Sequence, residues 1–259
     1  MYCYNRNSRK HPLHKLLMGG VSMFFTRKHQ LCFFGAVLMC VVCSLLFVRG
    51  KSALNVFSAG ELEQKVFVLD AGHGGEDGGA VSQDGTKESD INLSVTLRLD
   101  TLLKFLGHKT VLTRDSDVSI YSDGSSTLRQ KKRSDLQNRV SLVNAIPGAV
   151  LVSIHQNSMP SVPSVHGAQV FHGLTESSDE LALSVQETLN RSVNTGNEKQ
   201  SKKIDPSIYL MKKATCPAIL VECGFLSNRS EADSLRTPEY QKQLSAAIAA
   251  GLLNTEEMP

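Results

Sequence analysis

Acidic residues are missing from the first part of this 259-residue sequence. The first one is Glu61, whereas eight Lys and Arg residues precede it. Subtracting those eight from the 28 basic residues of the chain leaves 20, against 25 acidic residues, so the part beyond residue 60 has a net charge of −5. A domain that binds nucleic acid concentrates positive charge in its folded part. We therefore expect no nucleic-acid partner.

Cysteine is scarce beyond residue 60, where only Cys216 and Cys223 occur. No pair of CxxC motifs is present, which excludes a zinc site built from cysteines, and two cysteines are too few for a disulfide scaffold. The S-x-x-K and G-x-S-x-G motifs of serine acyl-enzymes are absent as well. The missing serine motifs leave little support for a serine acyl-enzyme mechanism.

An uninterrupted apolar run covers residues 31–48, with Arg27 and Lys28 before it and Arg49 after it. A run of about 18 apolar residues reaches the lower limit for a helix that crosses a membrane, and the basic residues before it predict a cytoplasmic N-terminus. A cleaved signal peptide is the competing interpretation, although no clear small-x-small cleavage motif follows. We expect a basic n-region, an anchor or signal segment, and a linker at residues 1–30, 31–48 and 49–64.

Residues 65–255 alternate short β-rich runs with helical periods, which is typical of one α/β domain. The helical run at residues 88–106 is followed by Gly107, a residue type that often ends helices. We expect a single three-layer domain, in which helices flank a mostly parallel or mixed, twisted sheet of about six strands. The expected strands are residues 66–70, 109–112, 150–154, 168–171, 207–211 and 219–222, and the expected helices are residues 88–106, 128–145, 178–193 and 238–253.

Polar residues follow the expected strands at the edge where open α/β sheets place their sites. His73 comes after the first strand, His155 after the third, and Glu222 ends the last, while Glu88 begins the first helix. Two imidazoles and one carboxylate are a ligand set of catalytic zinc, which keeps a fourth position open for water. The remaining carboxylate would act as general base and acid. The sequence thus predicts that these four side chains meet around one Zn²⁺ ion.

Six segments of the sequence carry a resemblance to a known family. They are VFVLDAGHGGEDGGA (66–80), KESDINL (87–93), VLTR (111–114), QNRVSLVN (137–144), LVSIHQN (151–157) and ILVECGFLSN (219–228). In this order they resemble the zinc-dependent N-acetylmuramoyl-L-alanine amidases of the amidase-3 family, which act on bacterial cell walls. The resemblance implies hydrolysis of the amide bond between N-acetylmuramic acid and L-alanine of peptidoglycan. By position, His73, Glu88 and His155 match the zinc ligands, and Glu222 matches the catalytic glutamate.

The resemblance also implies a location and partners. An enzyme of peptidoglycan works outside the cytoplasm, so we expect a periplasmic domain, anchored in the inner membrane or exported by a signal peptide. Some members carry a long helical insertion that plugs the active site and responds to activator proteins. The connections here are too short for it, so we expect an accessible site in a monomer. Regulation would then come from divisome or activator proteins.

Three alternatives remain open. His73 and Glu76 form an H-x-x-E pattern, which in zinc carboxypeptidases supplies two metal ligands. Glu88 would then only be a carboxylate that interacts with a helix dipole, and the chain would act as a peptidase on stem peptides. Cys223 could be a nucleophile, although a cysteine at a strand end is more often a small buried hydrophobic residue. Finally, the chain could be an envelope protein that binds peptidoglycan without catalysis.

Overall fold

The computed structural model describes residues 37–39 and 65–254, so most of the expected membrane or signal segment lies outside the described residues. Within the described residues, no helix has both the length and the apolar character needed to cross a membrane. The described chain contains a six-stranded sheet in the order β2-β1-β3-β6-β4-β5. Its strands are β1 (Val66–Ala71), β2 (Lys109–Leu112), β3 (Ala149–Asn157), β4 (Gln169–His172), β5 (Lys202–Lys203) and β6 (Ala218–Phe225).

The sheet is mixed, as expected. β2, β1, β3 and β6 run parallel to one another, whereas β4 pairs antiparallel with β6, and β5 pairs parallel with β4. Parallel strands that neighbour each other end at the same edge of a sheet. The carboxyl ends of β1, β3 and β6 therefore lie side by side, and the chain segments that follow them share one edge.

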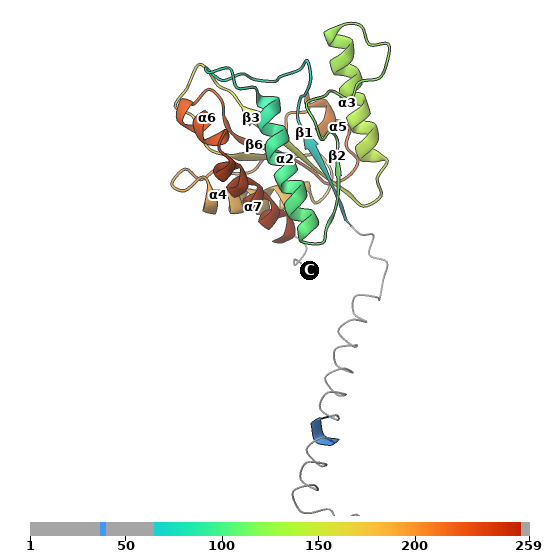
Figure 1. The fold of residues 1–259 in the computed structure, drawn as a ribbon, viewed down its shortest axis with the longest axis vertical. Helices are drawn as coiled ribbons and strands as arrows, with labels where there is room; N and C mark the ends of the chain where they lie inside the picture. The colour runs from blue at the N-terminus through green and yellow to red at the C-terminus, as the bar shows by residue number, and fades with distance from the viewer. Residues whose placement is uncertain (1–36, 40–64, 255–259) are drawn as a thin grey trace, which may run out of the picture. The chain divides into compact units, whose positions relative to one another are not determined.

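Helices cover both faces of the sheet (Figure 1). Alternating residues of β1 point to opposite faces: Phe67 and Leu69 join the core under α2, α4 and α7, whereas Val68 joins the core under α3 and α5. The sheet is thus buried on both sides, which confirms the α/β domain with three layers. The helices are α2 (Glu88–Phe105), α3 (Leu128–Asn144), α4 (Ser178–Ser192), α5 (Tyr209–Lys213), α6 (Arg229–Leu235) and α7 (Pro238–Asn254).

One expected strand is wrong. Residues 207–211 do not pair with the sheet, and most of them lie in the short helix α5. The Asp205 carboxylate accepts a hydrogen bond from the Ser207 N–H at 2.8 Å, which forms a local turn before the helix. Leu210 and Met211 then pack into the core under α3. The sixth strand is instead the two-residue β5, which lies outside every strand and helix expected from the sequence.

Candidate metal centre and active site

His73, Glu88 and His155 come together at the carboxyl-terminal edge of the sheet. Their possible ligand atoms all lie within 4.8 Å of one another. Glu88 Oε1 is 3.3 Å from His73 Nε2 and 2.9 Å from His155 Nδ1. The two imidazole rings meet edge to face, with their centroids 5.0 Å apart. Two nitrogen donors and one carboxylate therefore converge on one point, and this donor set fits a divalent ion such as zinc.

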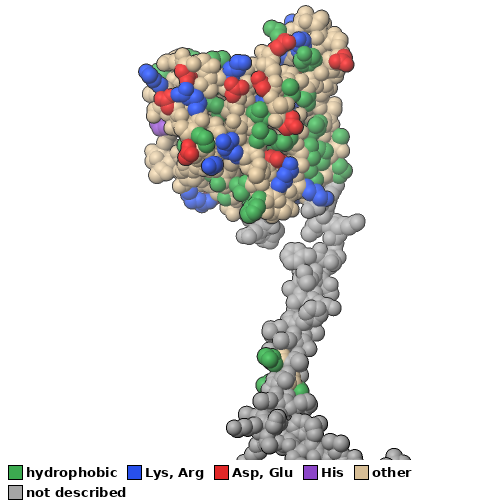
Figure 2. All heavy atoms as spheres, in the orientation of Figure 1, with side chains coloured by type: hydrophobic (Ala, Val, Ile, Leu, Met, Phe, Trp, Pro, Cys, Tyr) green, Lys and Arg blue, Asp and Glu red, His purple; other side chains and the backbone are tan. Residues whose placement is uncertain are grey.

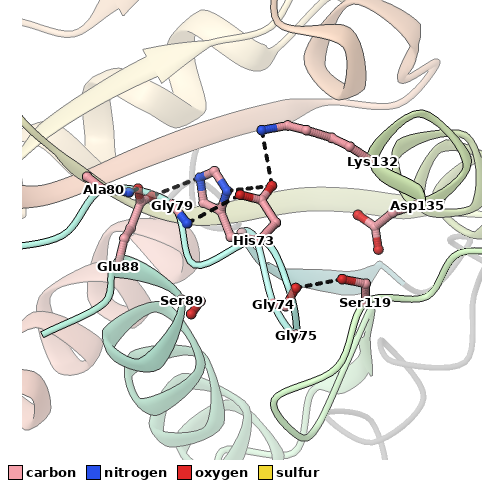
Figure 3. Close-up of polar contacts among 12 residues, drawn as sticks. His73, Gly74, Gly75, Gly79, Ala80, Glu88, Ser89, Ser119, Lys132 and Asp135 are labelled. Atoms are coloured by element: carbon pink, nitrogen blue, oxygen red, sulfur yellow. Dashed lines mark hydrogen bonds and ion pairs between the residues drawn. The ribbon is translucent and has the colours of Figure 1, made fainter. Parts of the chain in front are cut away.

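His73 adopts a backbone conformation that is unusual for a residue with a side chain. It lies two residues beyond the end of β1 and has a φ of 61°, which lies in the left-handed region and costs about 1–2 kcal/mol. Such strain persists only where the surroundings enforce it, and it is often found at functional sites. The conformation turns the imidazole toward the first turn of α2, where Glu88 is located (Figure 3).

Two buried arginines enforce the path of this loop. Arg139 of α3 donates hydrogen bonds to the carbonyl oxygens of Ala71 at 2.8 Å and His73 at 2.8 Å. Arg114, which follows β2, donates to the carbonyls of Ala71 at 2.9 Å and Gly72 at 3.1 Å. Because both guanidinium groups are buried, the three successive carbonyls of residues 71–73 have only one satisfied arrangement.

Buried carboxylates neutralise the positive charge of Arg139. Its guanidinium lies 2.6 Å from Asp70 and 2.7 Å from Asp135, and all three residues are buried. Burial alone would raise the pKa of Asp70, but the charge of Arg139 and a hydrogen bond from Ser153 hold it at about 2. Asp70 is therefore ionised, and the ion pair connects β1 to α3 directly beneath the site.

Two glycines let the ligands approach the backbone. A Cβ atom at position 72 would lie 2.3 Å from the ring of His155. A Cβ atom at position 79 would lie 2.5 Å from Glu88 Oε2, and Gly79 also has a φ of +68°. The glycines after β1 thus serve close packing around the ligands, in addition to the sharp turn that the sequence indicates.

Glu88 is held by several donors besides the imidazoles. Its Oε2 atom accepts a hydrogen bond from the Ala80 N–H at 2.9 Å (Figure 3). Its Oε1 atom accepts from Asn92 Nδ2 and from the Gln156 N–H, both at 3.2 Å. Asn92 is fixed in turn by its bond to the Gly72 carbonyl at 3.0 Å. This network fixes the carboxylate before any ion binds.

Asp77 continues the network on the other side of His73. Its carboxylate lies 3.0 Å from His73 Nδ1 and 3.1 Å from the Lys132 ammonium group of α3. Metal-bound histidines commonly donate their second ring N–H to a carboxylate, which fixes the tautomer and the ring orientation. Asp77 is placed for this role, and sequence reasoning did not single it out. The i, i+4 spacing from His73 is a signal that could have found it.

Charge governs the protonation of this cluster. Burial lowers the pKa of His73, but hydrogen bonds to Asp77 and Glu88 outweigh it and raise the pKa to about 9. Burial works against ionisation of Glu88 as well, but the two imidazoles hold its pKa well below the usual range. When no metal ion is bound, His73 is therefore protonated. Its positive charge neutralises part of the negative charge of Asp77 and Glu88.

Glu222 faces the same cluster from β6. It lies opposite His155 in the parallel pairing of β3 with β6. Its Oε2 atom is buried and has no hydrogen-bond partner. Burial raises the pKa of Glu222 to about 7, although the His155 imidazole opposes this shift. A buried carboxyl group with a free oxygen and a pKa near neutrality is suited to accept and release a proton.

The alternative residues are placed differently. Glu76 is exposed and forms an ion pair with Lys131 at 2.6 Å, and it is not part of the ligand cluster. Cys223 is completely buried, and burial strongly raises the pKa of its thiol, with the charge of Glu222 adding to the effect. A nucleophilic cysteine needs exposure and a lowered pKa. The geometry therefore favours Glu88 over Glu76 and argues against Cys223.

A comparison with protein families agrees with this geometry. The family model described as N-acetylmuramoyl-L-alanine amidase matches residues 67–254. The chain belongs to the N-acetylmuramoyl-L-alanine amidase family. It is an enzyme of this family, whose members hydrolyse peptidoglycan in cell-wall remodelling or germination. The match includes all four site residues that the sequence indicates.

Individual amidases are similar over the same region. The germination-specific N-acetylmuramoyl-L-alanine amidase of Bacillus subtilis is 37% identical over 194 residues, which cover 74% of this chain and 80% of the relative. The CwlD amidase from Clostridioides difficile, solved in complex with the GerS lipoprotein, is 39% identical with a TM-score of 0.70, covering 74% of this chain and 98% of the other. Amidase AmiC2 of Nostoc punctiforme is 32% identical with a TM-score of 0.64, covering 75% and 98%.

Proposed function

We propose that this amidase uses one zinc ion to hydrolyse the bond between the lactyl group of N-acetylmuramic acid and L-alanine, and that His73, Glu88 and His155 hold the ion. The observation that carries the proposal is the convergence of these three donors within 4.8 Å. Two imidazoles and one carboxylate leave one coordination position open, as hydrolytic zinc sites require. When bound, the ion would polarise the scissile carbonyl and acidify a water molecule.

Glu222 is proposed to carry the proton in this reaction. Water attacks the carbonyl carbon, the C–N bond breaks, and the leaving nitrogen of L-alanine must gain a proton. With a pKa of about 7, Glu222 can take that proton from water as a carboxylate and deliver it as a carboxylic acid. The products are a lactyl carboxylate on the glycan and a peptide with a free amino terminus.

The loops around the ligands support an accessible site. Residues 72–87 and 158–168, which follow β1 and β3, contain no helix, so neither carries the helical plug expected of regulated family members. Among the solved relatives, CwlD forms a complex with the GerS lipoprotein. We propose that an envelope protein regulates this amidase by contact from outside the site, and that the chain itself is monomeric.

Peptidoglycan lies outside the cytoplasm, so an amidase that acts on it is exported. We propose that residues 1–30 stay cytoplasmic or form the n-region of a signal, and that residues 31–48 are a membrane anchor or signal segment. Residues 49–64 would then connect this segment to a catalytic domain at residues 65–255 on the outer side of the membrane, in the periplasm of a two-membrane cell.

Product analysis on purified sacculi tests this function. The chain should release free peptides that begin with alanine and leave the glycan strands intact, and a chelator should stop the release. A Glu222→Gln variant serves as the inactive control. Release of single C-terminal amino acids would instead support the carboxypeptidase alternative, and binding without any release would support a non-catalytic envelope protein.

A further inference from the structure

An asparagine side chain is completely buried in α2, close to the site. Asn92 lies four residues after Glu88, so the two side chains share one side of the helix. The face of the domain seen in Figure 2 carries charged and hydrophobic side chains, whereas Asn92 is buried in the interior. A buried amide is unfavourable unless its polar atoms find partners. The role of Asn92 therefore follows from the groups that it contacts.

The amide of Asn92 has one possible orientation. Its Nδ2 atom donates a hydrogen bond to the Gly72 carbonyl at 3.0 Å and another to Glu88 Oε1 at 3.2 Å. A carbonyl and a carboxylate can only accept, so the nitrogen of the amide must face them. The Oδ1 atom accepts from Gln156 Nε2 at 3.1 Å. Both donors and the acceptor of Asn92 are thus satisfied in this orientation alone.

These partners belong to the three segments that carry the possible metal ligands. Gly72 directly precedes His73, Gln156 directly follows His155, and Glu88 is itself a possible ligand. The backbone at Gly72 also packs against His155, because a Cβ atom at position 72 would lie 2.3 Å from the imidazole ring. One buried amide therefore connects the ligand of α2 to segments that are 20 and 64 residues away in the sequence.

We infer that Asn92 is a positioning residue that sets the geometry of the metal centre; this inference rests on the proposed function. Arg114 also donates to the Gly72 carbonyl, at 3.1 Å, so Glu88 is the group that depends most on Asn92. Gln156 acts on the same carboxylate in two ways. Its side chain orients the Asn92 amide, and its backbone N–H donates to Glu88 Oε1 at 3.2 Å. Loss of the Asn92 donors should weaken metal binding although all three ligands remain.

Asn92→Asp tests the inference with almost no change of shape. The exchange replaces the donating nitrogen by an oxygen, which then faces two acceptors, the Gly72 carbonyl and Glu88 Oε1. The new carboxyl group either repels Glu88 or shares a proton with it, and both disturb the ligand. Zinc affinity, measured by competition with a chromophoric chelator, should fall about 100-fold.

Asn194→Asp is the matched control. Asn194 is also buried, and its side chain donates to the Ala168 carbonyl and accepts from the Ala168 N–H, both at 2.8 Å. The exchange therefore makes the same chemical change at another buried asparagine that bonds to the backbone. It should lower the stability of the chain and leave the zinc affinity unchanged, because none of these bonds involves a ligand or its neighbour in sequence.

Gln156→Met provides a second, milder variant. It removes the donor to Asn92 but keeps the backbone N–H that bonds to Glu88. It also removes a buried Oε1 atom that has no hydrogen-bond partner, so the variant should remain folded. Zinc affinity should fall about tenfold. The visible absorption of Co²⁺ bound in place of zinc, which reports the arrangement of the ligands, should change in this variant and in Asn92→Asp, but not in Asn194→Asp.

The outcomes separate the inference from the proposed function. Wild-type zinc affinity and an unchanged Co²⁺ spectrum in Asn92→Asp overturn the inference, and so does an equal loss of affinity in Asn194→Asp, which would show that metal binding follows general stability. If Asn92→Asp does not fold, Gln156→Met decides, and wild-type affinity in that variant overturns the inference. If the wild type itself binds no metal, the proposed function fails and the inference fails with it.

Discussion

Glu222 on β6 lies opposite His155 on β3 in the parallel register of the two strands. This pairing brings a carboxyl group without a hydrogen-bond partner for Oε2 to the edge where the three possible metal ligands meet. The register is fixed by the buried residues of both strands, since a slip of one position would move every side chain to the other face. The position of the proposed proton carrier thus follows from the packing of the sheet.

Replacing Glu222 by Gln should separate catalysis from metal binding. Without a titratable group at this position, kcat should fall by about 10²–10⁴-fold, whereas the zinc content should stay unchanged because the ligands are intact. Glu239→Gln, which removes an exposed carboxylate at the start of α7, is the control with the same charge change. Steady-state kinetics and metal analysis check both variants. Full turnover in Glu222→Gln would contradict the proposed role.

Exchanging Glu88 and Glu76 for Gln distinguishes the two candidate ligand sets. Glu88→Gln should weaken zinc binding by more than the roughly 10–100-fold that loss of an outer partner causes. Glu76→Gln should leave the affinity nearly unchanged, because its carboxylate pairs with Lys131 outside the cluster. Competition titration with a chromophoric chelator measures both values. The reverse order of the two effects would make Glu76 the ligand.

Asp77→Asn tests the support of His73. The variant keeps the shape of the side chain but removes the charge that orients the imidazole at 3.0 Å. Zinc affinity should drop by about 10–100-fold while the fold remains intact. Asp123→Asn, an exposed residue of the segment before α3, is the matched control. Equal zinc affinity of Asp77→Asn and the wild type would show that the contact does not support metal binding.

Zinc binding should release a proton at neutral pH. The pKa of His73 is raised to about 9, so without metal this imidazole is protonated at pH 7 and must lose its proton to become a ligand. The apparent affinity should therefore rise with pH until about pH 9 and then level off. Calorimetry in buffers of different ionisation enthalpy counts the protons released. Absence of proton release at pH 7 would be inconsistent with His73 as a ligand.

The ion pair between Asp70 and Arg139 should make stability depend on acid pH. The pKa of Asp70 is lowered from 3.8 to about 2, so folding favours its ionised form. The resulting contribution, about 2 kcal/mol, is present above pH 4 and is lost as the pH falls toward 2. Denaturant unfolding across this range measures the loss.

The same ion pair also has a mutational test. Asp70→Asn should lower the free energy of unfolding at pH 7 by about 3–5 kcal/mol, because it leaves the buried Arg139 partly uncompensated. It should also remove the Asp70 share of the pH dependence. Asp123→Asn should do neither. A variant as stable as the wild type would show that the ion pair contributes nothing to the free energy of unfolding.

The sequence was sufficient for the parts of the structure that depend on local order. Apolar runs and helical periods gave β1, β3 and α2, and the shared edge of parallel strands predicted that His73, His155 and Glu222 would meet. The seven-residue helix α6 was missed, although Asn228 caps it by accepting from the Glu231 N–H at 3.1 Å. An Asn followed by Glu three residues later is a recognisable start signal for a helix.

What local patterns could not supply are contacts between distant segments. Arg139 donates to carbonyls 66 and 68 residues away, and nothing in the sequence of α3 indicates that this arginine is buried. The sequence likewise does not indicate that Arg114 is buried or that His73 adopts a left-handed backbone conformation. The support of the site is therefore visible only in the folded chain, whereas its chemical groups are visible in the sequence.

The most direct test of the account is the position of zinc in crystals of the zinc-loaded chain, located by anomalous scattering at the zinc edge. A single peak should lie about 2.0–2.2 Å from one nitrogen of His73, one nitrogen of His155 and one oxygen of Glu88. A peak on Glu76 in place of Glu88, or no peak among these side chains at saturating zinc, would contradict it.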